Sequence, residues 1–262
     1  MSKIAVMSLS GGMDSTGLLL HLLSNEYDVK ALSFNYGQKH VIEIERASAN
    51  IEYLKQNGYL VKHKIVDLKS AMSVFHSALT DENFDVPRGH YEQDNMKATV
   101  VPNRNAIFTS ILYGFALSIA IKHDQSVTIT TGVHSGDHEI YPDCREEFFI
   151  KLYNAFDYGN WGSDKVDSYL PFINGDKYTI LKEALWCCDD LGLDFNTIFA
   201  NTNTSYAPDK DGLSDGTTGA DVERILAFHQ LGRIDPVKYV KSWDEVLHDA
   251  LKIEREFYAT ND

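Results

Sequence analysis

The stretch "SLSGGMDSTG" (residues 8–17) joins two apolar segments of different character. Before it, "KIAVMSL" (3–9) is short and almost wholly apolar, as in a strand buried within a sheet. After it, "STGLLLHLL" (15–23) has the composition of a helix that packs against such a strand. The stretch therefore predicts a strand, a glycine-rich turn and a helix, the unit from which α/β sheets are built.

The turn itself has the features of an anion-binding loop. Gly11 and Gly12 let the chain turn sharply and bring backbone amides close to a ligand. The helix N-terminus adds unpaired amides, and the hydroxyls of Ser10 and Ser15 are further donors. Asp14 does not favour an anion directly, so we expect it to cap the helix, a role open to Ser15 as well, or to hold Mg²⁺. The spacing matches neither the Walker loop nor the dinucleotide-binding G-x-G-x-x-G.

Strand and helix patterns alternate along the first two thirds of the chain. Further strands are predicted at 29–36, 61–66 and 126–133, and helices at 44–54, 108–119 and from about 145. This alternation predicts an α/β protein with a doubly wound, mostly parallel sheet, which binds ligands at the carboxyl ends of its strands. We therefore expect the loops 10–15, 35–40 and 132–143 to converge on one crevice. Residues 80–98 are polar and are predicted to form an excursion or lid rather than core.

The last third of the chain has a different pattern. Strand signals fade after about residue 176, and helical patterns remain at 177–191, 220–231 and 242–258. We therefore expect an α/β domain over residues 1–192, followed by a small helical C-terminal appendage over 193–262.

The composition limits the functional class. The chain has 262 residues, a formal net charge of −14 and 44% hydrophobic residues, which is typical of a soluble globular protein. An acidic surface repels the phosphate backbone, so we expect no direct nucleic-acid partner, and no apolar run has the length of a membrane span. Three cysteines without a C-x-x-C spacing suit a reducing compartment, so we expect a cytoplasmic protein.

Five stretches together resemble a known enzyme family. The S-G-G-x-D-S of residues 10–15 resembles the PP-loop of the ATP pyrophosphatases, whose fold is adenine nucleotide alpha-hydrolase-like. Four more stretches resemble signatures of 7-cyano-7-deazaguanine synthase, an enzyme of queuosine precursor synthesis, and occur in that family's order. They are "ALSFNYGQKH" (31–40), "VPNRNAIF" (101–108), "YPDCREEF" (141–148) and "PFINGDKYTIL" (171–181).

The resemblance implies a set of site residues. The positions that match for ATP binding are Ser8, Leu9, Ser10, Gly11, Gly12, Asp14, Ser15, Asn35, Tyr36 and Gln38. Those that match for substrate binding are Arg104, Asn105, Tyr141 and Asp143, and those for catalysis are Asp14, Lys177 and Arg104. ATP and Mg²⁺ are the implied cofactors, and a homodimer is the implied assembly.

Each of these side chains also has a plain structural reading. Arg104 either neutralises a phosphate or carboxylate or is a surface residue that opens a helix. Asp143 either pairs with the guanidine-like edge of a deazaguanine or caps a helix, and Tyr141 either stacks on the base or packs in the interior. Lys177 contacts phosphate oxygens or starts a solvated helix, and its matching segment favours the first.

Two histidines near the predicted crevice were candidates for a metal site. His134 and His138 lack a third ligand in the sequence nearby, so we expect them to be solvated loop residues.

The resemblance implies a ligase that uses ATP twice. It would convert 7-carboxy-7-deazaguanine and ammonia to 7-cyano-7-deazaguanine through adenylated carboxylate and amide intermediates, releasing AMP and pyrophosphate. A related ligase that stops at the amide, or joins the carboxylate to another amine in phage DNA modification or antiphage defence, remains an alternative. A non-catalytic nucleotide-binding subunit is a further one.

The family's zinc site is where the sequence departs from the pattern. Synthases of this family carry four zinc-binding cysteines, and the matching positions here are Ser205, Asp215, Thr218 and Asp221. Because serine and threonine oxygens bind Zn²⁺ poorly, we predict no zinc. We expect a hydrogen-bonded loop, with an Asp-lined Ca²⁺ or Mg²⁺ site as the alternative, and helices after residue 232 that pack over it.

Overall fold

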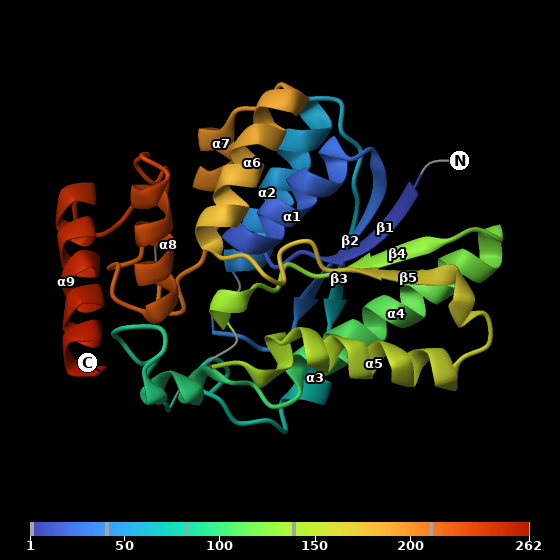
Figure 1. Cartoon of the computed structure of the whole chain (residues 1–262), viewed down its shortest axis with the longest axis horizontal. Coiled ribbons are helices and arrows are strands. Elements are labelled where there is room, and N and C mark those ends of the chain that lie inside the picture. The colour runs from blue at the N-terminus through green and yellow to red at the C-terminus, as the bar shows by residue number, and fades with distance from the viewer. Residues whose placement is uncertain (1–2, 40–41, 82, 138–139, 210–211, 262) are drawn as a thin grey trace.

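The protein is built around a five-stranded sheet in which every paired neighbour is parallel (Figure 1). The computed structural model describes residues 3–39, 42–81, 83–137, 140–209 and 212–261. The strand order is β3-β2-β1-β4-β5, so the chain reverses its direction of winding after β3. The strands are β1 (Lys3–Ser8), β2 (Tyr27–Asn35), β3 (Lys62–Asp67), β4 (Val127–Thr130) and β5 (Val166–Tyr169).

Helices cover both faces of this sheet. On one face lie α1, α2, α6 and α7, and on the other lie α4 and α5 (Figure 1). The α-helices are α1 (Met13–Ser24), α2 (Ile42–Gln56), α3 (Lys69–Met72), α4 (Arg104–His123), α5 (Glu146–Gly159), α6 (Lys177–Leu191), α7 (Phe195–Ala200), α8 (Gly219–Gln230) and α9 (Trp243–Asn261). Short 3₁₀ helices are η1 (Asp94–Thr99), η2 (Ser135–Asp137), η3 (Pro142–Cys144) and η4 (Ser163–Lys165).

The central strand shows why both faces are covered. Along β1, Ala5 and Met7 belong to the core beneath α1 and α6, whereas Ile4 and Val6 belong to the core beneath α4. Successive side chains of a strand point to opposite faces, so an unbroken apolar run requires a helical layer on each side. The predicted doubly wound α/β architecture is therefore confirmed.

Contrary to the expectation that no apolar run has the length of a membrane span, helix α4 is apolar and long enough to cross a membrane by length and composition alone. Here it packs against β1, β4 and β5, and its buried residues include Leu112, Ala116 and Ala120 at helical spacing. This is the pattern of the core helix of a sheet protein.

Two features of the first 176 residues differ from the sequence prediction. The edge strand β5 was not predicted, because "VDSY" is short and mostly polar and three of its four residues are exposed. The segment 80–98 is an excursion, as predicted, but it is not free of core residues. His90, Tyr91 and Met96 are buried in it.

The C-terminal helices extend from the α6 side of the sheet. Helix α8 packs on α6, and α9 packs on α8 at the left of Figure 1. Phe199 of α7 and Phe228 of α8 belong to the same core cluster as α1, while Val246 and Ala250 of α9 form a smaller cluster with α8. The division at residue 192 stays a prediction.

Candidate active site

The loop after β1 is held by close contacts between backbones. Gly11 has a φ of +93°, and a Cβ at this position would overlap the carbonyl oxygen of Glu43 at the start of α2. A Cβ on Gly132, after β4, would lie 3.2 Å from the carbonyl of Asp14 on the other side of the loop. These glycines let α2 and the loop after β4 approach the turn closely, so its path is fixed by main-chain packing.

Side-chain hydroxyls complete the turn. Ser10 and Ser15 Oγ lie 2.9 Å apart, the Gly12 amide donates to Ser10 Oγ at 3.1 Å, and the Ser10 amide donates to Ser15 Oγ at 3.2 Å. From the C-terminal region, the Asn203 amide donates to the Gly11 carbonyl at 3.0 Å. The turn is thus preorganised, and the helix N-terminus behind it starts at Met13 with Gly12 as N-cap.

A charged cluster lies at the first turn of α1. Lys177 Nζ, on the first residue of α6, is 3.3 Å from Asp14 Oδ2, 3.2 Å from Glu223 Oε2 and 3.0 Å from His134 Nε2. Lys177 is only 6% exposed, so it is not the solvated helix start of the plain reading. Four segments that are far apart in sequence, namely α1, the loop after β4, α6 and α8, therefore meet around one ammonium at the end of the loop.

Asp14 does not cap helix α1, contrary to one of its two predicted roles, because no side chain caps this helix. Burial alone would raise the pKa of Asp14, but Lys177 and His134 lower it well below its usual range, so the group is a carboxylate. Its Oδ1 is buried and has no hydrogen-bond partner among the described residues. A buried carboxylate oxygen without a partner fits a Mg²⁺ ion or a donor of a bound ligand.

The prediction for His134 as a solvated loop residue was wrong. Its side chain is fully buried beside Lys177 and lies 3.7 Å from Asp14 Oδ2. Sequence patterns could not show this, because the contact depends on α1, α6 and the loop after β4 meeting in space. His138 lies outside the described residues.

A first cavity of about 210 Å³ opens at the carboxyl ends of β1 and β2. Phe34 and Phe108 stack in its wall, with ring centroids 4.2 Å apart and planes 9° from parallel. Tyr36 and Gln38, two of the positions predicted to bind ATP, line this cavity. The Gln38 carboxamide accepts the Tyr36 amide and donates to the Phe34 carbonyl. Such a flat aromatic wall suits a purine-like base.

The remaining predicted ATP positions contribute in different ways. Ser8 and Ser10 line the cavity, whereas the Leu9 side chain is fully buried and offers only its backbone. Asn35 does not line it, and its Oδ1 is buried without a partner among the described residues.

Glu43, which was not predicted, lies in the same cavity. Burial raises the pKa of Glu43 to about 7, although Arg104 and a hydrogen bond from Asn203 act against this rise. Glu43 also supplies the carbonyl that a side chain at position 11 would overlap. The polar start of α2 looks solvated in sequence, so no local signal marks this residue.

A second cavity of about 190 Å³ lies between the loop and the N-terminus of α4. Arg104 and Asn105 line both cavities, and Asp14 and Ser15 line the second. Thr131 lines it too, and its Oγ1 is buried without a partner among the described residues. Arg104 opens α4, as in its plain reading, but it stands between the two cavities rather than on the outer surface.

The other predicted substrate residues support this wall. Asp143 Oδ2 accepts the Asn105 amide at 3.3 Å, so it interacts with the first turn of α4 and not with the helix that follows it. Tyr141 is 3% exposed and its hydroxyl lies 2.5 Å from Thr99 Oγ1, with Arg104 over its ring at 5.9 Å. In this state Tyr141 is packed in the interior.

Three of the four positions that match the family's zinc ligands form a hydrogen-bonded group around Asp221. Asp221 Oδ2 lies 3.1 Å from Ser205 Oγ and 2.5 Å from Thr218 Oγ1, and it accepts the Thr218 amide in a capping box that starts α8. Burial raises the pKa of Asp221 despite these donors. Asp215 lies apart from this group and pairs with Arg88.

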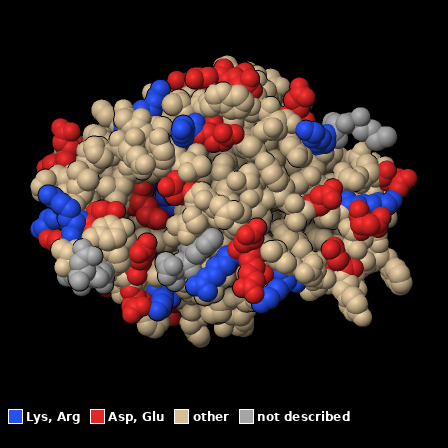
Figure 2. Space-filling view, viewed as in Figure 1, with Lys and Arg blue, Asp and Glu red and all other residues tan. Residues whose placement is uncertain are grey.

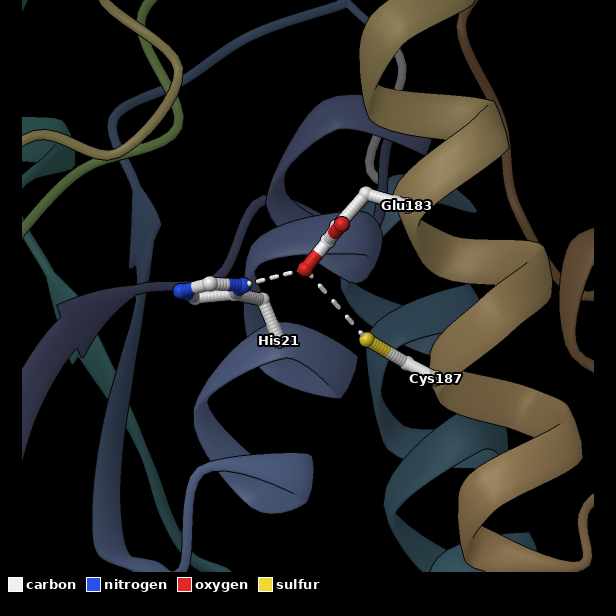
Figure 3. Close-up of side chains that lie close together, drawn as sticks. All are labelled: His21, Glu183 and Cys187. Atoms are coloured by element: carbon white, nitrogen blue, oxygen red, sulfur yellow. Dashed lines mark hydrogen bonds and ion pairs between the residues drawn. The ribbon is translucent and has the colours of Figure 1, made fainter.

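A possible set of metal ligands lies elsewhere, between α1 and α6. His21, Glu183 and Cys187 come close together, as Figure 3 shows. Glu183 Oε1 lies 2.8 Å from His21 Nδ1. The other ring nitrogen of His21, Nε2, lies 2.9 Å from the Tyr169 hydroxyl. Burial raises the pKa of Cys187 to about 12, so the thiol is protonated. These groups join α1, α6 and β5, and they line neither cavity described above.

Comparison with known proteins places the chain in a family. The model of the family "Queuosine biosynthesis protein QueC" matches residues 4–232. The chain belongs to the QueC family. A 7-cyano-7-deazaguanine synthase from Marinomonas sp. (strain MWYL1) is 40% identical over 239 residues, which is 91% of this chain and 99% of the relative. The "7-cyano-7-deazaguanine synthase 2" of Colwellia psychrerythraea is 41% identical over 240 residues, and the enzyme of Methanoregula boonei is 38% identical over 235.

Solved structures give a more distant likeness. An NMN synthetase from Francisella tularensis aligns over 95% of this chain and 84% of its own, with 15% identity and a TM-score of 0.42. A 4-thiouridine synthetase in complex with RNA and ATP covers 97% of this chain and 53% of its own, with 14% identity and a TM-score of 0.45. Likeness at this level supports no statement about substrates.

Proposed function

We infer that the protein is a 7-cyano-7-deazaguanine synthase, an ATP-dependent ligase that forms a nitrile from a carboxylate and ammonia. One observation carries this inference: relatives with that name are about 40% identical and align over 91% of the chain and nearly all of their own length. The loop of residues 8–15 and the Lys177 cluster lie within the matched region.

For ATP, we propose that the loop holds the β and γ phosphates and that the first cavity holds the adenosine. The backbone amide of Gly11, with the helix N-terminus behind it, would bind phosphate oxygens. Phe108 and Tyr36 would enclose the base. Lys177 would then neutralise charge that develops between the α and β phosphates, because it is held at the end of the loop.

For the deazaguanine, we propose the second cavity. It lies beside the loop, so a carboxylate bound there would face the α phosphate of ATP. Arg104 stands at the junction of both cavities and would hold the carboxylate in place, since a guanidinium can bind a carboxylate through two hydrogen bonds. Asp143, held by Asn105, has a second carboxylate oxygen for the guanidine-like edge of the base.

The reaction balances in two ATP-dependent stages. A carboxylate oxygen attacks the α phosphorus, pyrophosphate leaves, and ammonia then displaces AMP from the acyl carbon to give the amide. The amide oxygen attacks the α phosphorus of a second ATP, and pyrophosphate and one N–H proton leave. Loss of AMP with the second N–H proton then gives the nitrile. The residues of the site orient the two substrates and exclude water from the acyl-adenylate.

We also propose the ions of the site. Asp14 Oδ1 is the described group that best fits Mg²⁺, which would screen the phosphates when ATP is bound. At the former zinc positions we propose no metal, because the oxygens of Ser205, Thr218 and Asp221 already satisfy one another.

The assembly and surroundings are proposals of the same kind. We propose a cytoplasmic homodimer without a direct nucleic-acid partner, to be tested by light scattering and by a filter-binding assay with tRNA. On the face shown in Figure 2, acidic side chains are spread among basic ones and no continuous basic area is present. The net charge of −14 points the same way.

The test is a product analysis. The protein is incubated with ATP, Mg²⁺, ammonium and 7-carboxy-7-deazaguanine, and products are identified by mass spectrometry. The inference predicts the nitrile and two AMP for each nitrile. Formation of the amide alone, or of a conjugate when another amine is supplied, would show that the protein is the related ligase and not a nitrile-forming synthase. Absence of AMP with every amine would leave only the reading as a nucleotide-binding subunit. Lys177→Met is the matched control and should form no AMP above background.

A further inference from the structure

His90 is buried at a place where the catalytic chemistry does not require it. Its side chain is only 8% exposed, although it lies in the polar excursion between β3 and α4. Its ring stacks on Phe257 of α9, with centroids 3.7 Å apart and planes 6° from parallel, and Tyr258 contacts it edge-on at 5.9 Å. His90 Nε2 is 3.0 Å from Glu254 Oε2, also on α9. The C-terminal half of one helix thus encloses this ring.

The hydrogen bonds of His90 assign its tautomer. The Glu92 amide donates to His90 Nδ1 at 3.2 Å, so this nitrogen carries the lone pair. The ring proton of the neutral form is therefore on Nε2, where it is donated to the Glu254 carboxylate. This bond needs only an acceptor at position 254, not a negative charge.

The residues before His90 are fixed to the loop that precedes α8. The Arg88 guanidinium pairs with Asp215 and donates to Thr217 Oγ1 at 2.6 Å. The Gly89 amide donates to the Thr217 carbonyl at 3.0 Å. Two different parts of the C-terminal region therefore hold residues 88–90.

The next residue reaches the catalytic cluster. Tyr91 is 3% exposed, and its ring lies over Lys177 Nζ at 5.9 Å from the centroid. It packs so closely on α8 that a Cβ at Gly219 would lie 2.9 Å from Tyr91 Cα. A cavity of about 270 Å³ separates Lys177 from α9 and is lined by His90, Tyr91, Glu223 and Glu254 among others. Figure 1 shows the end of α9 beside the excursion that carries these residues.

We propose that Glu254 and Phe257 of α9 are positioning residues for the active site. They hold His90, His90 holds Tyr91, and Tyr91 keeps the Lys177 ammonium directed at Asp14 and the phosphate loop. The family match ends at residue 232, before α9 begins at Trp243, so this device lies outside the region that the family model covers. The catalytic part of the proposal rests on the proposed function.

The first experiment measures the geometry and needs no turnover. In the full chain, Glu254→Ala and Phe257→Ala should raise hydrogen exchange of amides 89–92 by about tenfold or more. The rate at which an amine-acylating reagent modifies Lys177 should also rise in these variants, because the Tyr91 ring would no longer cover the Lys177 ammonium. Lys252→Ala is the matched control, because Lys252 lies on the same helix with its side chain 60% exposed. Unchanged exchange and unchanged acylation in both variants would overturn the proposal.

The second experiment measures catalysis. The two alanine variants should lower kcat about tenfold with a KM for ATP within about twofold of wild type, because only the alignment of Lys177 changes. Glu254→Gln and Phe257→Tyr should restore kcat, since the first keeps an acceptor and the second keeps an aromatic ring. A normal kcat together with raised exchange would show that α9 fixes the segment but does not position Lys177. If wild type forms no AMP, the proposed function fails while exchange and acylation still decide whether the device exists.

Discussion

The loop of residues 8–15 and the loop before α8 are both tight turns that start a helix, but they are held in different ways. At residues 8–15, glycines let neighbouring backbones make close contact. Any side chain in place of Gly11 would put a Cβ into the Glu43 carbonyl. At residues 214–221, side-chain oxygens hold the turn around Asp221, in place of the cysteines of the family pattern. The first turn is thus fixed by main-chain packing, and the second is fixed by the hydrogen bonds of its side chains.

The largest expected effect comes from adding a methyl group to the first turn. Gly11→Ala should lower kcat/KM about 100-fold or more, because the overlap with the Glu43 carbonyl shifts the loop by an amount comparable to an ångström. Gly58→Ala is the matched control: its φ is +90°, and nothing lies within 4 Å of the added atom. Equal losses of activity in both variants would show that backbone strain at a positive φ, and not overlap with the Glu43 carbonyl, causes the loss.

The second effect concerns the segment after residue 232, which packs over the turn of residues 214–221. Val240 donates to the Ser214 carbonyl at 2.8 Å, and a Cβ at Gly216 would lie 3.0 Å from Val246. Truncation after residue 232 removes these contacts and exposes the apolar face of α8, so the melting temperature should fall by about 10 °C. Truncation after residue 258 is the control and should change it little. An unchanged melting curve for the shorter protein would show that the turn needs no cover.

The third effect depends on pH and isolates Glu43. Because burial raises the pKa of Glu43 from 4.5 to about 7, the folded state prefers the protonated form. Relative to Glu43→Gln, wild type should therefore lose stability as pH rises from about 4.5 to about 7, by roughly 3 kcal/mol. Urea unfolding of both proteins at pH 4.5, 6 and 7.5 measures this difference. A difference that stays constant with pH would mean that folding does not raise the pKa of Glu43.

The last prediction is that removal of metal ions has no effect on stability. EDTA should leave the melting temperature unchanged, because hydrogen bonds rather than zinc hold Ser205, Thr218 and Asp221 together. Metal analysis of the purified protein accompanies the melt. One equivalent of zinc, lost together with several degrees of stability on chelation, would refute the proposed replacement.

The same contrast explains what the sequence could predict. The first four strands and the glycine-rich turn before α1 were predicted correctly, because each is encoded in a short contiguous stretch. Lys177 was singled out from such a stretch too, and its role stays a prediction. His134 and Glu223 were missed as partners of Lys177, since their contacts join elements that are more than 40 residues apart. Glu43 gave no local signal, because an acidic residue that opens a helix is normally solvated. Strand β5 was missed because an exposed edge strand lacks the apolar pattern that marks a buried one.

The central claim is that one site adenylates first the carboxylate and then the amide of the same molecule. It is tested most directly with 7-carboxy-7-deazaguanine carrying ¹⁸O at both carboxylate positions. The account predicts two AMP for each nitrile, each with one ¹⁸O in its phosphate, because both substrate oxygens leave on AMP. AMP without ¹⁸O, or label recovered in pyrophosphate or water, would contradict it.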